Sequence, residues 1–182
     1  VDRAEEELGG FPYPEGRARI RAFRAEFRRV RGDLEQAHAL SRAAVAAWED
    51  LDRPAGRASS LVTSGEILRD LDRLDAAEER FSRAVETFAR VGEESGRLRA
   101  DAYRAALSVR RGRPEDATGP LEEAAERLVD RGDRVYGARV RILAAETTAR
   151  ATPPSETVAE LETLAADLEE RGLHLHHLLA LH

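Results

Sequence analysis

Apolar residues recur along this chain of 182 residues at spacings that place them on one face of a helix. Ala77, Phe81, Ala84, Val85 and Phe88 are an example, because the later four stand 4, 7, 8 and 11 residues after the first. These offsets form one stripe of an amphipathic helix. No repeated column requires strand alternation, so the pattern predicts an almost wholly helical chain.

The helical pattern returns with a period of 40 residues. Gly92, Gly132 and Gly172 are spaced by 40, and Asp52 stands one period earlier. A column of large apolar residues keeps the same step at Trp48, Phe88, Leu128 and Leu168. Four units with one period and no insertion indicate a repeat array.

Each unit reads as a helix, a tight turn and a second helix. Breaks are expected near residues 32, 52, 72, 92, 112, 132, 152 and 172. The glycine column closes the second helix, where a left-handed residue is common. In the third unit, Gly119 and Pro120 lie where the second helix should already be running, so we expect that helix to start late or to kink. Neither helix can bury its stripe alone, so neighbouring units must stack.

The repeat predicts a single array over residues 1–182. Its units span 17–52, 57–92, 97–132 and 137–172, with the end of a preceding unit at 1–8 and the start of a next one at 173–182. Val1, Ala4 and Leu8 stand one period before Ser41, Ala44 and Trp48. We therefore expect an array that is truncated at both ends.

Small and large apolar columns should be buried between the helices. The positions are Ala25, Gly65, Ala105, Ala145, Ala37, Ala77, Phe81, Leu121, Leu161, Trp48, Phe88, Leu128 and Leu168.

The second unit carries Gly65, Leu68, Ala77 and Phe81 at the spacings of the tetratricopeptide pattern. Over essentially its whole length the chain resembles the tetratricopeptide repeat family. It is most similar to the long-helix variants of large bacterial regulators and kinesin-light-chain-like proteins. A period of 40 also suits HEAT or armadillo units, but the small-residue columns favour the tetratricopeptide pattern. The resemblance implies an all-α fold, an α-solenoid coiled as a right-handed superhelix, whose first helices line a concave surface.

Twelve positions on the first helices are expected to face a partner on that surface. They are Arg19, Glu26, Arg29, Ser59, Glu66, Arg69, Arg99, Tyr103, Arg110, Arg139, Glu146 and Arg150. Equivalent positions in successive units point the same way, so Arg19, Arg99 and Arg139 should form one continuous ridge with the glutamates interleaved. Such a ridge can bind carboxylates in bidentate fashion. Alternatively, pairs such as Glu26 with Arg29 are ordinary exposed ion pairs. Exchanging Arg99 and Arg139 for glutamate is expected to leave stability nearly unchanged.

Composition removes several classes of function. The chain has no cysteine, so neither disulfides nor thiolate metal sites nor cysteine nucleophiles are expected. Its net charge of −6 disfavours nonspecific binding to nucleic acid. No apolar run reaches the roughly 20 residues that span a bilayer, so we expect no membrane partner and a cytoplasmic location. The sequence has no nucleophile elbow and no phosphate-binding loop, so neither an enzyme nor a cofactor is expected. His174, His176, His177 and His182 cluster without nearby carboxylates, and we expect no metal site there.

The leading prediction is a protein-interaction scaffold that binds a partner segment of mixed charge, with several carboxylates, in its concave groove. The main alternative is a regulatory or sensor arm of a larger bacterial signalling protein or transcription regulator. An enzyme built on a helical solenoid ranks last, because the sequence offers no perturbed acids and no metal ligands.

Overall fold

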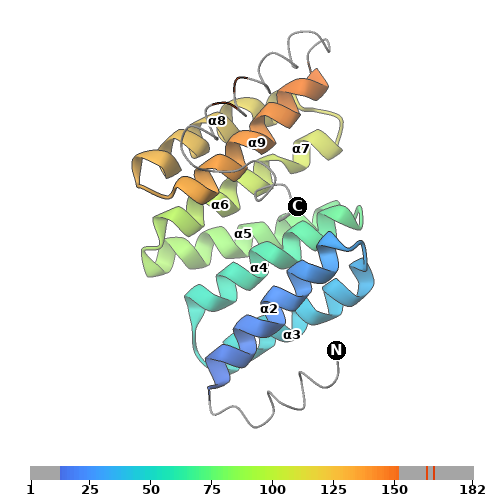
Figure 1. Ribbon diagram of the computed structural model, residues 1–182, viewed down its shortest axis with the longest axis vertical. Coiled ribbons are helices and arrows are strands. Elements are labelled where there is room, and N and C mark those ends of the chain that lie inside the picture. The colour runs from blue at the N-terminus through green and yellow to red at the C-terminus, as the bar shows by residue number, and fades with distance from the viewer. Residues whose placement is uncertain (1–12, 152–162, 164–165, 167–182) are drawn as a thin grey trace.

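The computed structural model describes residues 13–151 together with residues 163 and 166, and it is built from helices joined by short turns (Figure 1). Within these residues there is no strand, which agrees with the helical periodicity. The helices in chain order are α2 (Pro14–Val30), α3 (Leu34–Asp50), α4 (Pro54–Asp70), α5 (Leu74–Val91), α6 (Glu94–Ala105), α7 (Leu107–Arg110), α8 (Glu115–Asp130) and α9 (Arg134–Ala151).

The turns between these helices share one geometry and recur every 20 residues. The residues with positive φ are Gly32, Asp52, Asp72, Gly92, Gly112 and Gly132. In each turn the next amide donates to the carbonyl five residues back, as Glu93 N does to Phe88 O at 3.0 Å. This is the hydrogen bond of a Schellman motif. The breaks predicted near these six positions are confirmed, and those near 152 and 172 lie outside the described residues.

The expectation that the second helix of the third unit starts late is wrong, because α8 begins at Glu115 and contains Pro120. Ala117 and Leu121 on this helix are completely buried. Their packing outweighs the hydrogen bond that Pro120 cannot donate.

The first helix of the third unit is divided at Ala106, where α6 ends and α7 begins. Val109 N donates to Ala106 O at 3.2 Å, a bond of the tighter three-residue type. Ala106 is buried against the α8 residues Ala117 and Leu121. The prediction that Ala105 is buried is therefore wrong by one residue.

Most of the predicted core is confirmed. The buried positions are Ala25, Ala37, Trp48, Gly65, Ala77, Phe81, Phe88, Leu121 and Leu128. Ala145 is only half-buried, contrary to the prediction. In the same helical turn of α9, Ala144 is the buried alanine, and it packs in the cluster formed with α8. Leu161 and Leu168 lie outside the described residues.

Glycines allow each unit to approach the next closely. A Cβ at Gly56 would lie 2.6 Å from the ring of Trp48, and a Cβ at Gly96 would lie 2.6 Å from the ring of Phe88. In both cases a large side chain of a second helix packs on the first helix of the following unit. The large-residue column and the glycine column are thus the two halves of one repeated contact.

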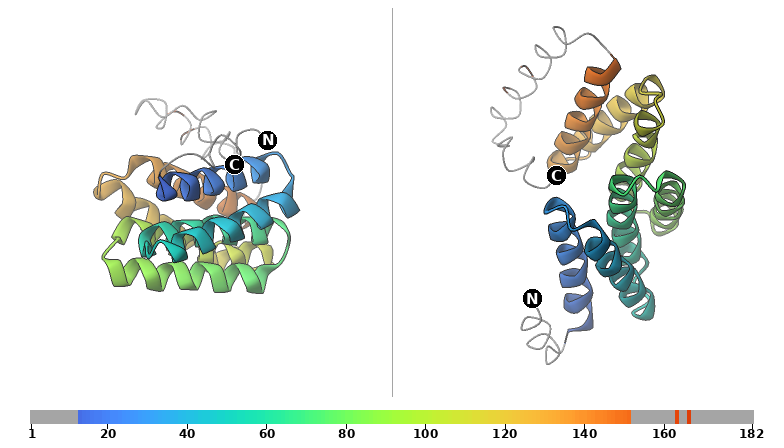
Figure 2. Two further views of the ribbon diagram at one scale, coloured as in Figure 1. Left: turned by 90° about the horizontal axis from the view of Figure 1, so that it is seen from below. Right: turned by 90° about the vertical axis from the view of Figure 1, so that its right-hand side faces the viewer.

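The stacked units form an α-solenoid that curves toward its first helices. These helices, α2, α4, α6 and α9, contact one another from unit to unit. Figure 2 shows the resulting arc, with α2 and α9 on the same side of it. Among the described helices, none is both long and apolar enough to cross a bilayer.

Candidate functional site

A groove of about 660 Å³ opens between the first helices on the inner side of the arc. Arg19 of α2, Ser59 of α4 and Arg99 of α6 line it, so three residues spaced by 40 in sequence meet one cavity. Trp48 and Phe88 reach it from the second helices. The groove therefore combines cationic groups with an aromatic floor, and three of the predicted site residues belong to it.

Arg99 is held against an aromatic ring in this groove. Its guanidinium carbon lies 4.3 Å from the centre of the Tyr136 ring, a cation–π distance. The Nε atom of Arg99 is buried and has no hydrogen-bond partner among residues 13–151. The contact with Tyr136 orients the side chain at the groove.

Arg19 and Arg99 have no carboxylate within ion-pair distance in the described part of the chain, whereas Arg53 at the same groove pairs with Glu15. Arg19 is exposed. Glu93 adds a negative charge at the groove. The two arginines can therefore accept carboxylates, while Glu15 and Glu93 oppose a uniformly acidic ligand.

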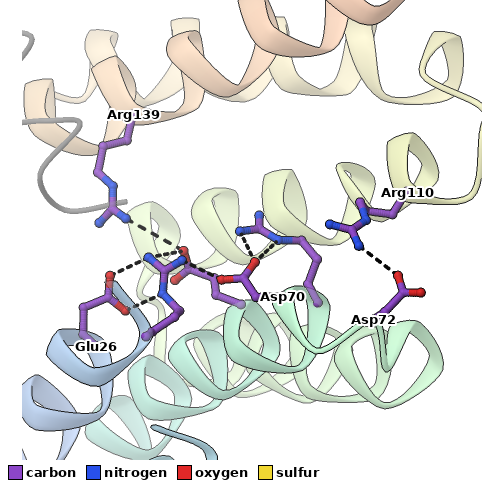
Figure 3. A network of polar contacts seen from close by, with 8 residues as sticks. Glu26, Asp70, Asp72, Arg110 and Arg139 are labelled. Carbon is purple, nitrogen blue, oxygen red and sulfur yellow. Dashed lines mark hydrogen bonds and ion pairs between the residues drawn. The ribbon is translucent and has the colours of Figure 1, made fainter. Parts of the chain in front are cut away.

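A second group of predicted residues forms a polar network at the centre of the concave face (Figure 3). Arg29 is buried and donates to both carboxylate oxygens of Glu26, at 3.0 and 2.7 Å, and to Asp70 at 2.9 Å. Arg69 donates to the other oxygen of Asp70 at 3.0 and 3.1 Å. Four charged side chains from α2 and α4 thus join the first two units.

Glu66 lies beside this network and is almost fully buried. Its Oε1 atom is 3.9 Å from Arg29 Nη2 and 3.8 Å from Arg139 Nη2, which is ion-pair distance but too long for a hydrogen bond. The hydroxyl of Tyr103 on α6 is buried as well, and within the described chain neither it nor Glu66 Oε1 has a hydrogen-bond partner. All four first helices therefore contribute a polar group to this centre.

Burial determines the electrostatics of the centre. It raises the pKa of Glu66, because desolvation of the carboxylate outweighs the attraction of Arg29 and Arg139. It also raises the pKa of Tyr103, to which the negative charge of Glu66 adds. For Arg29, desolvation opposes the charged form, but the hydrogen bond to Glu26 and the nearby carboxylates prevail and raise the pKa.

A smaller cavity of about 210 Å³ lies between α4, α7 and α9. Arg69, Arg110 and Glu146 line it. Arg110 is engaged by Asp72, with Nη2 and Oδ1 3.0 Å apart. This cavity has little apolar surface to offer a ligand, and its arginines are already paired with aspartates.

The structure thus divides the predicted ridge into three parts. Arg19, Ser59 and Arg99 line the groove. Glu26, Arg29, Glu66, Tyr103 and Arg139 form the central network and its surroundings. Arg69, Arg110 and Glu146 line the smaller cavity. Arg150 belongs to α9, but its side chain is outside the described part.

The prediction of one continuous exposed ridge is therefore wrong at the centre of the concave face. Arg29, Glu66 and Tyr103 are buried, and Arg139 keeps only 11% of its side chain exposed. These residues hold the units together. Among the predicted arginines whose side chains are described, Arg19 in the groove and Arg110 at the smaller cavity are exposed.

Sequence reasoning missed Tyr136, Arg53 and Asp70. For Tyr136 a signal was present: it stands where the period of 40 would place a fourth glycine after Gly16, Gly56 and Gly96. For Asp70 the only signal was its separation of 41 residues from Arg29, which is one residue more than the period and so places the two residues near equivalent positions of successive units. The histidines 174, 176, 177 and 182 lie outside the described residues, in which there is no group of three metal-ligating side chains.

Comparison of the chain with protein-family models, with curated proteins and with solved structures gives no match. The conclusions about function therefore depend on the geometry of the concave face.

Proposed function

We propose that the chain is a tetratricopeptide-like scaffold that binds a segment of a partner protein in the groove between α2, α4, α6 and α9. The observation that carries the proposal is the pair Arg19 and Arg99, which face an aromatic-floored cavity without a carboxylate partner in the described chain. A segment with an aromatic or aliphatic side chain would pack against Tyr136 and the small exposed part of Trp48. Carboxylates on either side of it would pair with the two arginines.

The groove favours a partner of mixed charge. Two unpaired guanidinium groups attract acidic residues, and Glu93 repels them at one edge of the groove. The mouth of the groove is open to solvent at Arg19, so this part of the attraction should weaken as salt increases.

Trp48 provides a direct readout, because it is the single tryptophan of the chain and lines the groove. A display library of 12-residue peptides is selected on the full chain, and enriched peptides are titrated while tryptophan fluorescence is recorded. We expect enrichment of peptides that combine Asp or Glu with an aromatic residue. Their binding should shift the emission of Trp48 and weaken as salt is added.

The double variant Arg19→Glu with Arg99→Glu should lose these peptides by about tenfold or more in affinity, the cost of replacing attraction by repulsion at two contacts. The matched control is Arg42→Glu with Arg90→Glu, which makes the same charge change at exposed positions of α3 and α5. Equal affinity of both double variants for the enriched peptides would exclude the groove as the binding site.

The size of the groove also supports the regulatory alternative, because about 660 Å³ is within the range of small-molecule pockets. In that case the same residues would hold a small aromatic acid that a larger regulator senses. Quenching of Trp48 by members of an aromatic-acid library, together with failure of the peptide selection, would favour the sensor arm over the scaffold.

A further inference from the structure

The outer side of α2 carries a row of exposed apolar side chains. Phe23, Phe27 and Val30 follow one another at steps of four and three residues, which places them in line on one side of the helix. Their exposed fractions are 69%, 51% and 39%. We call these three residues the α2 stripe.

In later units the same side of the first helix is covered by protein. Phe27, Ile67 and Leu107 are spaced by 40 residues, and the last two are only 0% and 1% exposed. Ile67 on α4 packs with Ala25 and Ala37, which belong to the two helices of the preceding unit. This side of a first helix is therefore one on which other helices dock in the array.

Two arginines stand at the ends of the α2 stripe. Arg19 precedes Phe23 by four residues and Arg31 follows Phe27 by four, so each lies next to an exposed ring. The guanidinium carbon of Arg31 is 5.7 Å from the centre of the Phe27 ring. Both arginines are exposed, and neither has a carboxylate within ion-pair distance in the described part of the chain.

The remaining charges of α2 leave this positive potential in place. The helix contains six arginines and only two glutamates, whereas the whole chain has a net charge of −6. Glu26 is held by Arg29, and Glu15 is held by Arg53. The α2 stripe is thus an apolar surface on a basic helix of an acidic protein.

We propose that the α2 stripe is a docking site for an acidic amphipathic helix of a partner protein, an interaction beyond the capture of a segment in the groove. The apolar row of the partner helix packs on Phe23 and Phe27, as helices pack ridge into groove. Carboxylates beside that row pair with Arg19 and Arg31 at the two ends of the stripe.

Charge favours this occupant over a second copy of the chain and over a lipid surface. Two α2 stripes face to face would bring two basic helices together, which costs energy. The net charge of −6 opposes approach to an anionic membrane. A partner helix that supplies acidic residues meets neither obstacle.

A display library of helices of about five turns, with apolar and charged positions randomised, provides the probe. It is selected on the full chain and then depleted on the variant Phe23→Ser with Phe27→Ser. Both residues are largely exposed, so this variant should stay folded, which its thermal melt verifies. We expect the surviving helices to carry more Asp and Glu than Lys and Arg.

Two matched single-cysteine variants show where a surviving helix binds, because the chain has no natural cysteine. Val30 is the last residue of α2 and Val91 the last of α5, and they are 39% and 37% exposed. Val30→Cys therefore reports on the stripe, and Val91→Cys is its control. The rate of reaction with a thiol reagent is measured for each variant, alone and with a saturating helix.

Without a helix the two thiols should react at rates within about threefold of each other, because both are accessible. A saturating helix should slow the thiol at position 30 by about tenfold and leave that at position 91 unchanged. Arg31→Glu should weaken helix binding by about fivefold, and Arg42→Glu on α3, the same charge change elsewhere, by less than about twofold. Arg99→Glu, which disturbs the groove alone, should leave helix binding intact, so the two proposals fail separately.

The proposal is overturned if no helix survives the depletion step, or if the surviving helices are basic. Slow reaction at position 30 without any helix would also overturn it. Slow reaction that is relieved by dilution would assign the stripe to a second copy, and slow reaction at every concentration would assign it to another segment of this chain. Protection of position 30 by vesicles containing phosphatidylserine would assign it to a lipid surface.

Discussion

The guanidinium of Arg139 on α9 lies 3.8 Å from the carboxylate of Glu66 on α4, although α5 to α8 separate the two residues along the chain. The exposed fractions of the two side chains are 11% and 5%. An ion pair at this depth is costly to break, because the remaining charge stays in a poorly solvated place. The pair therefore connects two units that are not neighbours in sequence.

Reversing the charge of Arg139 should destabilise the fold. Arg139→Glu places a second carboxylate against Glu66 and is expected to lower the free energy of unfolding by about 3 kcal/mol or more. This differs from the expectation drawn from sequence, which treated Arg139 as an exposed charge. Arg19→Glu makes the same charge change at an exposed position and should cost less than about 0.5 kcal/mol. Urea denaturation followed by circular dichroism measures both, and equal losses would show that the pair does not join the units.

The raised pKa of Glu66 predicts a specific dependence of stability on pH. The folded state holds a proton on Glu66 more tightly than the unfolded state, whose pKa is near 4.5. The contribution of Glu66 to stability is therefore lost as the pH rises from about 4.5 through the raised pKa. Glu66→Gln removes this titration, so the variant should gain stability relative to the parent over that window and keep a constant difference above it.

The difference in unfolding free energy between the parent and Glu66→Gln, measured at several pH values, isolates this residue from all other titrating groups. If the variant instead loses stability relative to the parent as the pH rises, the attraction of the arginines outweighs desolvation of the Glu66 carboxylate.

Gly56→Ala should disturb the contact between the first two units. The new Cβ would lie 2.6 Å from the Trp48 ring, so the ring or the helix must shift, at a cost of about 1–3 kcal/mol. The control is Gly119→Ala inside α8, where an added Cβ meets no side chain of the described residues within 4 Å other than those of its neighbours Thr118 and Pro120. That change should alter the free energy of unfolding by less than about 0.5 kcal/mol, because the helix preference of alanine is opposed by the contact of its Cβ with the ring of Pro120. Thermal melts and the emission of Trp48 distinguish the two outcomes, and a stabilising Gly56→Ala would refute the close packing.

Asp52 should be replaceable by glycine with a gain in stability. Its φ of 51° is left-handed, a conformation that costs side chains energy and glycine nothing. Asp52→Gly is expected to raise the free energy of unfolding by about 0.5–1 kcal/mol. Ala43→Gly, at an exposed position inside α3, should lower it by a similar amount, since glycine weakens a helix interior. A loss of stability in both variants would indicate that Asp52 has a role beyond the turn.

The turns and the core were predictable because each depends on local spacing. A left-handed residue every 20 positions fixes where each helix ends, and a large residue such as Trp48 eight positions before a glycine fixes how units stack. The errors at Ala105 and Ala145 were smaller than one helical turn. They arose where the first helix is divided and at the edge of the described array.

The division of the concave face could not be read from the sequence. Equivalent positions in successive units do point the same way, but the curvature of the array determines the distance between their side chains. Arg99 meets Tyr136 in the groove, whereas Arg139, one period later, reaches back to Glu66. Curvature is the sum of all contacts between units, and no single column of residues encodes it.

The constant length of the turns makes the helix pair an exchangeable cassette. Removing residues 54–93 would join Arg53 to Glu94 and leave the Schellman turn at Asp52 unchanged. Trp48 would then face Gly96, a glycine that already accepts an aromatic ring from Phe88. The shortened chain should keep its helical register while losing Glu66 and Asp70. Such an array could therefore change its length by whole units during evolution without a new interface having to arise.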